Sequence, residues 1–350
     1  MYVKQASWCL GCLKYIGNEL DQSLKKHQMT NVLMYSIGLS TYVHMYLVNT
    51  GGSAGLTAAK LAGGTLGKSV VIIEKAKLGG DCTWTGCVPS KSLIASAKAA
   101  QATRKQLQQN PPVSFQEVRQ RFEHNVQHIF EEDDSAQALE KFNVDTITGS
   151  AKLMSSNTVQ VDDSLEIRAK EGVILCTGAV PKVPDIPGLE SVNFITYEEV
   201  WELEELPKKM TVVGGGPIGC ELAQAFRRLG SEVTIIATKL LPREEPEVSE
   251  ILEEIFADEG IVVSKGTVTE VEKDGSGHKA FYKRSDGSVG EVSGDTLLVS
   301  VGRHPNVKNM GLLEVGVEAD DRRGIVVNDK LQTSVKGVYA AGDCTGDRQL

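Results

Sequence analysis

Two cysteines in a glycine-rich segment are the residues best suited to chemistry in this chain. Cys82 and Cys87 are separated by four residues in the segment Gly79-Gly-Asp-Cys-Thr-Trp-Thr-Gly-Cys-Val-Pro-Ser-Lys91, just before an expected helix from Pro89 to Ala100. The dipole at a helix N-terminus stabilises a thiolate and lowers the pKa of the thiol. The second thiol can close a small disulfide that accepts two electrons. The segment therefore predicts a redox-active pair, with a structural disulfide as the alternative.

A complete glycine fingerprint predicts a dinucleotide site. Gly214, Gly216 and Gly219 stand between a predicted strand, Met210–Val213, and a predicted helix, Cys220–Leu229. The first glycine permits a tight turn, the second lets a pyrophosphate approach the backbone, and the third allows close packing of helix and strand. The pyrophosphate then lies on the helix N-terminus. An ordinary glycine turn is the alternative.

The end of the following strand, Glu232–Ala237, indicates which nucleotide binds. NAD sites place an acidic residue there for the ribose 2′-hydroxyl, whereas NADP sites have a cation nearby. Here Thr238 and Lys239 follow the strand and no acidic residue is present. The sequence favours NADPH, with NADH as the alternative.

A second, imperfect fingerprint lies nearer the N-terminus. It reads Thr50-Gly-Gly-Ser-Ala-Gly55, with threonine in place of the first glycine, and Asn49 stands where an apolar residue is expected. A helical stretch, Leu56–Ala62, and a strand, Ser69–Glu74, follow. Glu74 is placed to bind a ribose hydroxyl. The pattern predicts an FAD site, and the alternative is a distorted turn that binds nothing.

The elements around these motifs predict two α/β domains with parallel sheets. Each glycine turn opens a βαβ unit, and each unit is later followed by an apolar strand ending in glycine, at Val173–Gly178 and Thr296–Gly302. A helix at Phe115–Glu132 and a polar β meander at Thr146–Arg168 lie between them, and a last strand spans Gly337–Ala341. Alternating strands and helices of this kind indicate Rossmann-like folds.

Composition limits the classes of partner and compartment. The chain has 350 residues, a net charge of −9 and no basic block, so nucleic acid is not an expected partner. Seven scattered cysteines are an odd count, unlike a secreted disulfide framework. We therefore expect an intracellular protein, cytoplasmic or organellar, in which any disulfide is catalytic.

The N-terminal stretch carries no clear function. Cys9 and Cys12 form a CxxC motif with no second pair at a suitable spacing, so no metal site is expected. Val32–Val48 is fairly apolar, but it is short for a membrane span and contains several polar residues. No membrane association is expected.

Four motifs in order give the chain a family resemblance. They are the Cys82–Lys91 segment, Ile174-Leu-Cys-Thr-Gly-Ala179, Val301-Gly-Arg-His-Pro-Asn306 and Ala340-Ala-Gly-Asp343. From Met45 to Leu350 the chain resembles the class I pyridine nucleotide–disulfide oxidoreductases, which include glutathione reductase, dihydrolipoamide dehydrogenase and mercuric reductase. Trp84-Thr85 and Ala237-Thr-Lys239 are most similar to mercuric-reductase-like members.

The resemblance implies roles for matching residues. Cys82 would exchange with substrate, Cys87 would be the thiolate facing the flavin, and Lys91 would pair with Glu221. Asp343 would bind the ribityl chain of FAD. The full set of expected cofactor-binding residues is Gly52, Ser53, Ala54, Gly55, Glu74, Lys75, Gly80, Asp81, Thr177, Gly178, Gly214, Gly216, Gly219, Thr238, Lys239, Gly302, Arg303, Gly342 and Asp343.

The same resemblance implies a domain order. Residues 1–44 would be an extension outside the family, and together with Thr50 they lead to the hypothesis of a mispredicted or rearranged first exon. Residues 45–195 and 296–350 would form a discontinuous FAD domain, and residues 196–295 an inserted NAD(P) domain. The family's C-terminal domain, which builds the homodimer and supplies a proton-transfer residue, is expected to be missing from this chain.

The function implied is an FAD-dependent oxidoreductase of cell redox homeostasis. Electrons would pass from NAD(P)H through FAD to a Cys82–Cys87 disulfide, and then to a disulfide or a soft metal ion. Two alternatives remain open: reduction of oxygen or a quinone, or an inactive truncated fragment.

Overall fold

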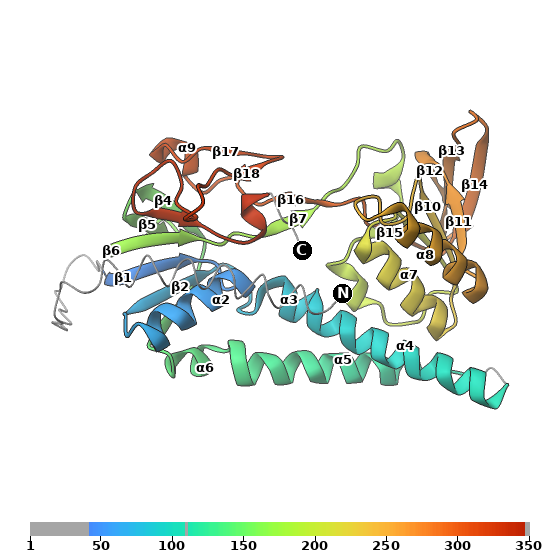
Figure 1. The fold of residues 1–350 in the computed structure, drawn as a ribbon, viewed down its shortest axis with the longest axis horizontal. Coiled ribbons are helices and arrows are strands. Elements are labelled where there is room, and N and C mark those ends of the chain that lie inside the picture. Colours follow the sequence, from blue (N-terminus) through green and yellow to red (C-terminus); the bar gives the residue numbers. More distant parts are fainter. Residues whose placement is uncertain (1–41, 109–110, 347–350) are drawn as a thin grey trace. The chain divides into compact units, whose positions relative to one another are not determined.

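A computed structural model describes residues 42–108 and 111–346 of the chain, which divide into two compact units. The first unit comprises the described parts of Met1–Gly80, Phe130–Val180 and His304–Leu350. The second comprises Asp81–Ile129 and Pro181–Arg303. Figure 1 shows the elements of each unit.

The first unit is built on a seven-stranded sheet in the order β3-β2-β1-β6-β5-β4, with β19 paired to β6. Strands β3, β2, β1, β6 and β19 are joined in parallel, whereas β4, β5 and the first part of β6 form an antiparallel meander. The bounds are β1 Tyr42–Asn49, β2 Val70–Glu74, β3 Val144–Thr148, β4 Ala151–Ser155, β5 Thr158–Val161, β6 Leu165–Leu175 and β19 Val338–Ala340.

Burial explains why the central strands are continuous apolar runs. All five residues of β2 are buried, as parallel strands covered on both faces require. Helix α2 (Ser53–Lys60) and the short helix α6 (Ala136–Glu140) contribute apolar side chains to this core, including Leu56 and Leu139. The remaining elements are two π-helical turns, Leu61–Thr65 and Phe130–Asp134, α9 Leu312–Val315, β17 Ala319–Asp320, β18 Gly324–Ile325 and a 3₁₀ turn at Asp343–Thr345.

The second unit contains a five-stranded parallel sheet in the order β11-β10-β9-β15-β8 and a three-stranded antiparallel sheet, β12-β13-β14. The strand bounds are β8 Phe194–Ile195, β9 Lys209–Val213, β10 Glu232–Ala237, β11 Val262–Lys265, β12 Thr267–Asp274, β13 Gly277–Lys283, β14 Val289–Gly294 and β15 Thr296–Val299. Two short strands, β7 Ala179–Pro181 and β16 Arg303–Pro305, lie where the chain passes from one unit to the other.

Five helices complete the second unit: α3 Gly80–Trp84, α4 Cys87–Leu107, α5 Phe115–Ile129, α7 Pro217–Leu229 and α8 Pro246–Glu259, with 3₁₀ turns at Leu189–Ser191 and Glu199–Glu202. The long helix α4 packs against both α5 and α7. Phe226 of α7 and Phe256 of α8 are almost fully buried in the core between helices and sheet. This core fixes the orientation of α4, whose first residue is Cys87.

The α/β class with parallel sheets is confirmed, and several bounds differ from the sequence prediction. The helix expected at Pro89–Ala100 is α4, which begins two residues earlier and ends at Leu107. The α-helix expected at Phe115–Glu132 ends at Ile129. In the predicted meander, β3 pairs in parallel with β2 and only β4–β6 are antiparallel.

Two other predictions concern the N-terminal stretch and the cofactor domains. Tyr42–Asn49, the end of the apolar stretch considered as a membrane span, is strand β1, while Cys9 and Cys12 lie outside the described residues. Among residues 42–108 and 111–346, no helix is long and apolar enough to cross a membrane. The predicted cofactor domains remain a prediction, because the two compact units are defined by chain contacts and not by ligands.

Candidate active site

The two predicted redox cysteines lie on two consecutive helices of the second unit, α3 and α4. Cys82 is in the middle of α3 and Cys87 is the first residue of α4, and both cysteines are reduced in this structure. Gly86 links the two helices, and a Cβ there would lie 2.8 Å from the carbonyl oxygen of Asp81. The tight loop therefore requires glycine at this position.

The surroundings of Cys87 favour the thiolate. Its pKa is lowered from 9.0 to about 6, with the hydrogen bond from Cys82 as the largest cause. Burial opposes this effect, while the positive charge of Lys91 and a backbone hydrogen bond at the helix start add to it. The helix start that the sequence indicated is thus one contributor among three, and the neighbouring thiol contributes most.

Lys91 and Glu221 form an ion pair across two helices. The Nζ atom of Lys91, one turn after Cys87 on α4, lies 3.1 Å from Oε2 of Glu221 on α7. Both side chains are about half exposed, which limits the strength of the pair. The structure therefore brings together the four residues predicted to be catalytic, and their roles in catalysis stay a prediction.

A second cluster braces the loop that carries Cys82. The carboxylate of Asp81 accepts a hydrogen bond from Arg303 (2.5 Å) and one from the hydroxyl of Tyr197 (3.2 Å). The guanidinium of Arg303 also lies over the ring of Tyr197, 5.1 Å from its centre. Asp81 and Arg303 were expected among the cofactor-binding residues, and the structure pairs them with each other.

The other end of this loop is held by a tryptophan. The indole N–H of Trp201 donates to the carbonyl oxygens of Thr85 and Tyr197, each at 2.8 Å. The ring also packs edge-on against Phe122 of α5, with 5.6 Å between ring centres. Sequence reasoning missed Tyr197 and Trp201, because they lie in a segment with no motif.

The complete fingerprint forms a turn into α7 as expected. Gly214 has a φ of 116°, and a Cβ at Gly219 would lie 2.7 Å from the carbonyl oxygen of Gly214. Gly216 is the N-cap of α7, with no side-chain cap, no acidic residue in the first turn and almost nothing near a Cβ. An uncapped, approachable helix N-terminus of this kind suits a pyrophosphate.

The residues after β10 lie against this turn. The backbone N–H of Leu241 donates to the carbonyl oxygen of Gly215 (2.7 Å), and a Cβ at Gly215 would meet the carbonyl oxygen of Lys239 at 2.4 Å. Thr238 is exposed and Lys239 is half-buried. The predicted pyrophosphate turn and the predicted ribose position are therefore neighbours.

The imperfect fingerprint also forms a turn, at a cost in backbone strain. Thr50 has a φ of 89°, a conformation that is unfavourable for a β-branched residue. Its hydroxyl donates to the carbonyl oxygen of Cys176, and its N–H donates to the carbonyl oxygen of Ile73 at 2.8 Å. Tertiary hydrogen bonds thus hold Thr50 in a conformation that glycine would adopt without strain.

The rest of this turn fits a phosphate-bearing cofactor. Gly52 is the N-cap of α2, which has no side-chain cap and no acidic residue among Ser53, Ala54 and Gly55. A Cβ on Gly52 would meet only the Cα of Gly80, at 3.9 Å. The helix N-terminus is open to an anion, so the residues present fit the pyrophosphate of FAD despite Thr50.

Glu74 ties the end of β2 to the same turn. Its carboxylate accepts hydrogen bonds from the backbone N–H of Gly51 (2.8 Å) and of Ala76 (2.9 Å). The buried carboxylate is therefore fixed beside the glycine turn, where a ribose hydroxyl is expected. Lys75, the next predicted residue, is exposed.

Four predicted residues lie beyond the adjacent strands β6 and β19. The hydroxyl of Thr177 donates to the carbonyl oxygen of Asn306 at 2.5 Å, and Gly178 has a φ of 68° with nothing within 4 Å of a Cβ. Gly342 has a φ of 84°, and a Cβ there would lie 2.9 Å from the Cβ of Ala54. Asp343 follows in a 3₁₀ turn, so these residues and α2 share one end of the sheet. Gly302, by contrast, belongs to the second unit, with a φ of 121°.

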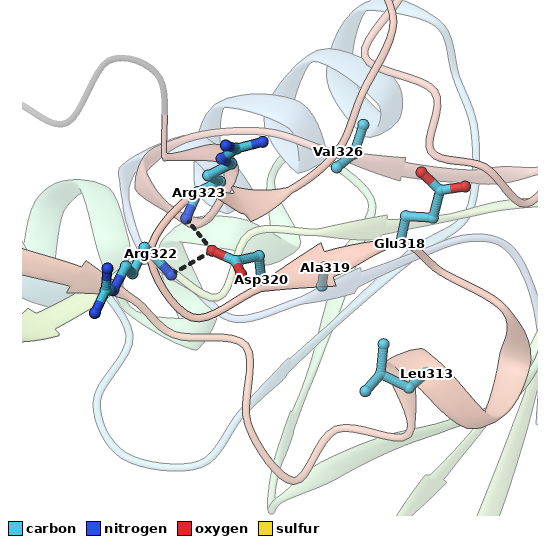
Figure 2. A pocket seen from close by; sticks show the side chains of 7 residues that line it. All are labelled: Leu313, Glu318, Ala319, Asp320, Arg322, Arg323 and Val326. Carbon is cyan, nitrogen blue, oxygen red and sulfur yellow. Dashed lines mark hydrogen bonds between the residues drawn. The ribbon is translucent and has the colours of Figure 1, made fainter.

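A hollow of about 500 Å³ in the first unit contains none of the predicted residues (Figure 2). It is lined by Leu313, Glu318, Ala319, Asp320, Arg322, Arg323 and Val326. The carboxylate of Asp320 accepts two hydrogen bonds of 2.8 Å from the backbone of the turn that follows it, which lower its pKa. The Asp320 carboxylate is thus hydrogen-bonded within its own turn, and we assign no catalytic or binding role to this hollow.

Comparison with known proteins agrees with this geometry. Residues 50–350 match the family described as pyridine nucleotide-disulphide oxidoreductase. The chain belongs to this family. It is 33% identical to a mercuric reductase of Lysinibacillus sphaericus over 313 residues, 86% of this chain and 56% of the relative. It is 32% identical to a dihydrolipoyl dehydrogenase of Chlamydia trachomatis over 312 residues, 86% of this chain and 65% of the relative.

Solved structures give the same result. The HOCl-induced flavoprotein disulfide reductase RclA from Escherichia coli superposes with a TM-score of 0.77 at 27% identity, covering 88% of this chain and 67% of that one. The matched family and the superposed flavoprotein disulfide reductase therefore agree on the fold of this chain. The chain spans little more than half the length of several of the curated relatives it matches.

Proposed function

We propose that this protein uses FAD and NADPH to reduce a disulfide between Cys82 and Cys87, and that the resulting dithiol reduces a disulfide or a soft metal ion. The single observation that carries the proposal is the Cys87 thiol, whose pKa is lowered to about 6 by Cys82 and Lys91. A structural cysteine has no need of a stabilised thiolate, whereas a redox cysteine reacts through it.

Each cysteine would have its own part in the cycle. When bound, FAD would accept a hydride from NADPH and supply two electrons for cleavage of the disulfide. Cleavage takes up these two electrons and one proton, and it leaves a thiol at Cys82 and a thiolate at Cys87. Cys82 would then attack a substrate disulfide and release one thiol. Cys87 would attack the mixed disulfide, release the second thiol and restore the Cys82–Cys87 bond.

A soft metal ion is a second class of acceptor for the same pair. Two neighbouring thiolates are ligands of the kind that soft metal ions prefer. The similarity to proteins named mercuric reductase supports this acceptor class at 30–36% identity. The ion would be substrate, bound between Cys82 and Cys87 before it is reduced.

Neighbouring residues would stabilise the Cys87 thiolate and bind the two cofactors. Lys91 would stabilise the Cys87 thiolate, and Glu221 would hold the Lys91 ammonium in place through their 3.1 Å ion pair. The pyrophosphate of NADPH would bind the N-terminus of α7, and that of FAD the N-terminus of α2. Lys239 and the absence of an acidic residue after β10 support NADPH over NADH.

Absorbance spectra and thiol counts on the purified, oxidised protein test the proposal. Flavin bands that bleach when NADPH is added without oxygen, together with two new alkylatable thiols per chain, are the expected result. In Cys87→Ser the bands should still bleach but the two thiols should not appear, whereas Cys220→Ser should behave like the parent. A colourless protein, or bleaching without new thiols in the parent, would contradict the proposal.

A further inference from the structure

A hollow lined by cations and hydroxyls lies at the end of strands β10 and β11. Its volume is about 480 Å³, and every residue that lines it belongs to the second unit. The lining residues are Thr238, Lys265, Gly266, Thr267, Thr269, Lys283, Arg284 and Ser285. It contains three cations and four hydroxyls, but no acidic residue.

This charge pattern points to an anionic ligand. Acidic residues outnumber basic residues 46 to 37 in the whole chain, so a hollow with three cations and no lining carboxylate is unlike the chain's average. Lys265 pairs with Glu253 at 2.8 Å, which reduces its contribution. Lys283, the last residue of β13, and Arg284, the residue after it, supply the remaining positive charge, and Arg284 shares part of its charge with Asp286, whose pKa it helps to lower.

Arg284 is held in position by its own hairpin. Its guanidinium donates to the hydroxyl of Tyr282 (2.9 Å) and lies 5.0 Å from the centre of that ring. Its backbone N–H donates to the carbonyl oxygen of Ser288 at 2.9 Å. A guanidinium fixed in this way loses less entropy when it binds a phosphate than a freely rotating one would.

The hollow is lined by residues adjacent in sequence to those that contact the dinucleotide turn. The N–H of Gly266, which lines the hollow, donates to the carbonyl oxygen of Ala237 at 3.1 Å. Thr238 also lines it and directly precedes the Lys239–Leu241 stretch that contacts Gly215 of the fingerprint. In dinucleotide folds the ribose of the adenosine half lies at the end of this second strand, where NADP carries its extra phosphate.

We propose that Lys283 and Arg284 select NADPH over NADH by binding its 2′-phosphate in this hollow. The inference rests on the proposed function and extends it to two residues at the C-terminal end of β13, which no motif indicates. Lys239 lies outside the lining, so the hollow provides a source of selectivity that is separate from the residue the sequence pointed to.

Binding of two nucleotide fragments tests the proposal without any redox reaction. Calorimetric titration of the purified chain with 2′,5′-ADP and with 5′-AMP measures the contribution of the 2′-phosphate. In Lys283→Gln/Arg284→Gln, affinity for 2′,5′-ADP should fall about tenfold, or about 1.4 kcal/mol, while affinity for 5′-AMP changes by less than about twofold. Lys273→Gln removes an exposed cation of the same sheet that does not line the hollow and should match the parent.

The outcomes separate this inference from the proposed function. Equal losses for both nucleotides, or no loss for 2′,5′-ADP, would overturn it. A titration with inorganic phosphate is the third measurement. If phosphate binding depends on Lys283 and Arg284 but 2′,5′-ADP binds no more tightly than 5′-AMP, the inference is also overturned. The hollow would then be assigned to another phosphorylated ligand. If NADPH fails to bleach the flavin but the selective loss is observed, the inference survives and the proposed function fails.

Discussion

Replacing Cys82 by alanine should make Cys87 a weaker acid and a slower nucleophile. Three influences lower the pKa of Cys87 from 9.0 to about 6 against the opposing effects of burial and Glu221, and the hydrogen bond from Cys82 is the largest of them. The largest of three must supply at least a third of the lowering, so the pKa in Cys82→Ala should be about 7 or higher. At pH 7 the thiolate fraction would then fall from about nine tenths to about one half or less.

The assay is alkylation of the reduced protein by iodoacetamide between pH 5 and 9, with the rate at Cys87 read from its peptide by mass spectrometry. The parent should show a midpoint near pH 6, and Cys82→Ala a midpoint at about pH 7 or above. Cys220→Ser is the control, because Cys220 is buried and its pKa is raised to about 12, so the midpoint at Cys87 should not move. A midpoint that stays near pH 6 in Cys82→Ala would refute the assignment of the neighbouring thiol as the main cause.

Three further predictions concern stability, measured by urea unfolding. Thr50→Gly should be more stable than Thr50→Ala by about 1–2 kcal/mol, because both lose the hydroxyl hydrogen bond but only glycine loses the strain at φ 89°; equal midpoints would contradict this. Arg228→Met should lower the free energy of unfolding by about 2–3 kcal/mol, because it leaves the largely buried Glu259 carboxylate without its bidentate partner. Arg243→Met, at an exposed site, is the control and should leave the free energy of unfolding nearly unchanged. Burial lowers the pKa of His278 below 6.5, so its neutral form favours folding above pH 6.5 and stability should fall as the pH drops below that value; His278→Leu should weaken this pH dependence, and an unchanged slope would contradict the reasoning.

The sequence predicted the parallel strands and the glycine turns because their signals are local. The four apolar residues that begin β2, Val70 to Ile73, are typical of a strand buried on both faces, and Gly214 and Gly219 are required by a positive φ and a close backbone contact. Helix α4 shows where such signals end. Its continuation to Leu107 depends on packing against α5 and α7, which the sequence does not display.

The tertiary partners of the site were beyond local reasoning. Asp81 was expected to contact a cofactor, but its ion pair with Arg303 joins residues 222 positions apart. Trp201 reaches the loop from 116 positions away. The pairing of Lys91 with Glu221, by contrast, was predicted through the family resemblance, and the structure contains the contact at 3.1 Å.

Bracing of the loop around Cys82 bears on the reduction potential of the pair. Asp81 is anchored by Arg303 and Thr85 by Trp201, so both sides of Cys82 are restrained when the disulfide is open. Restraint keeps the two sulfur atoms at a high effective concentration relative to each other, which favours closure of the ring over capture by another thiol. A dithiol that closes readily gives up electrons readily, so the brace should make the Cys82–Cys87 couple a stronger reductant than the same cysteines in a flexible loop.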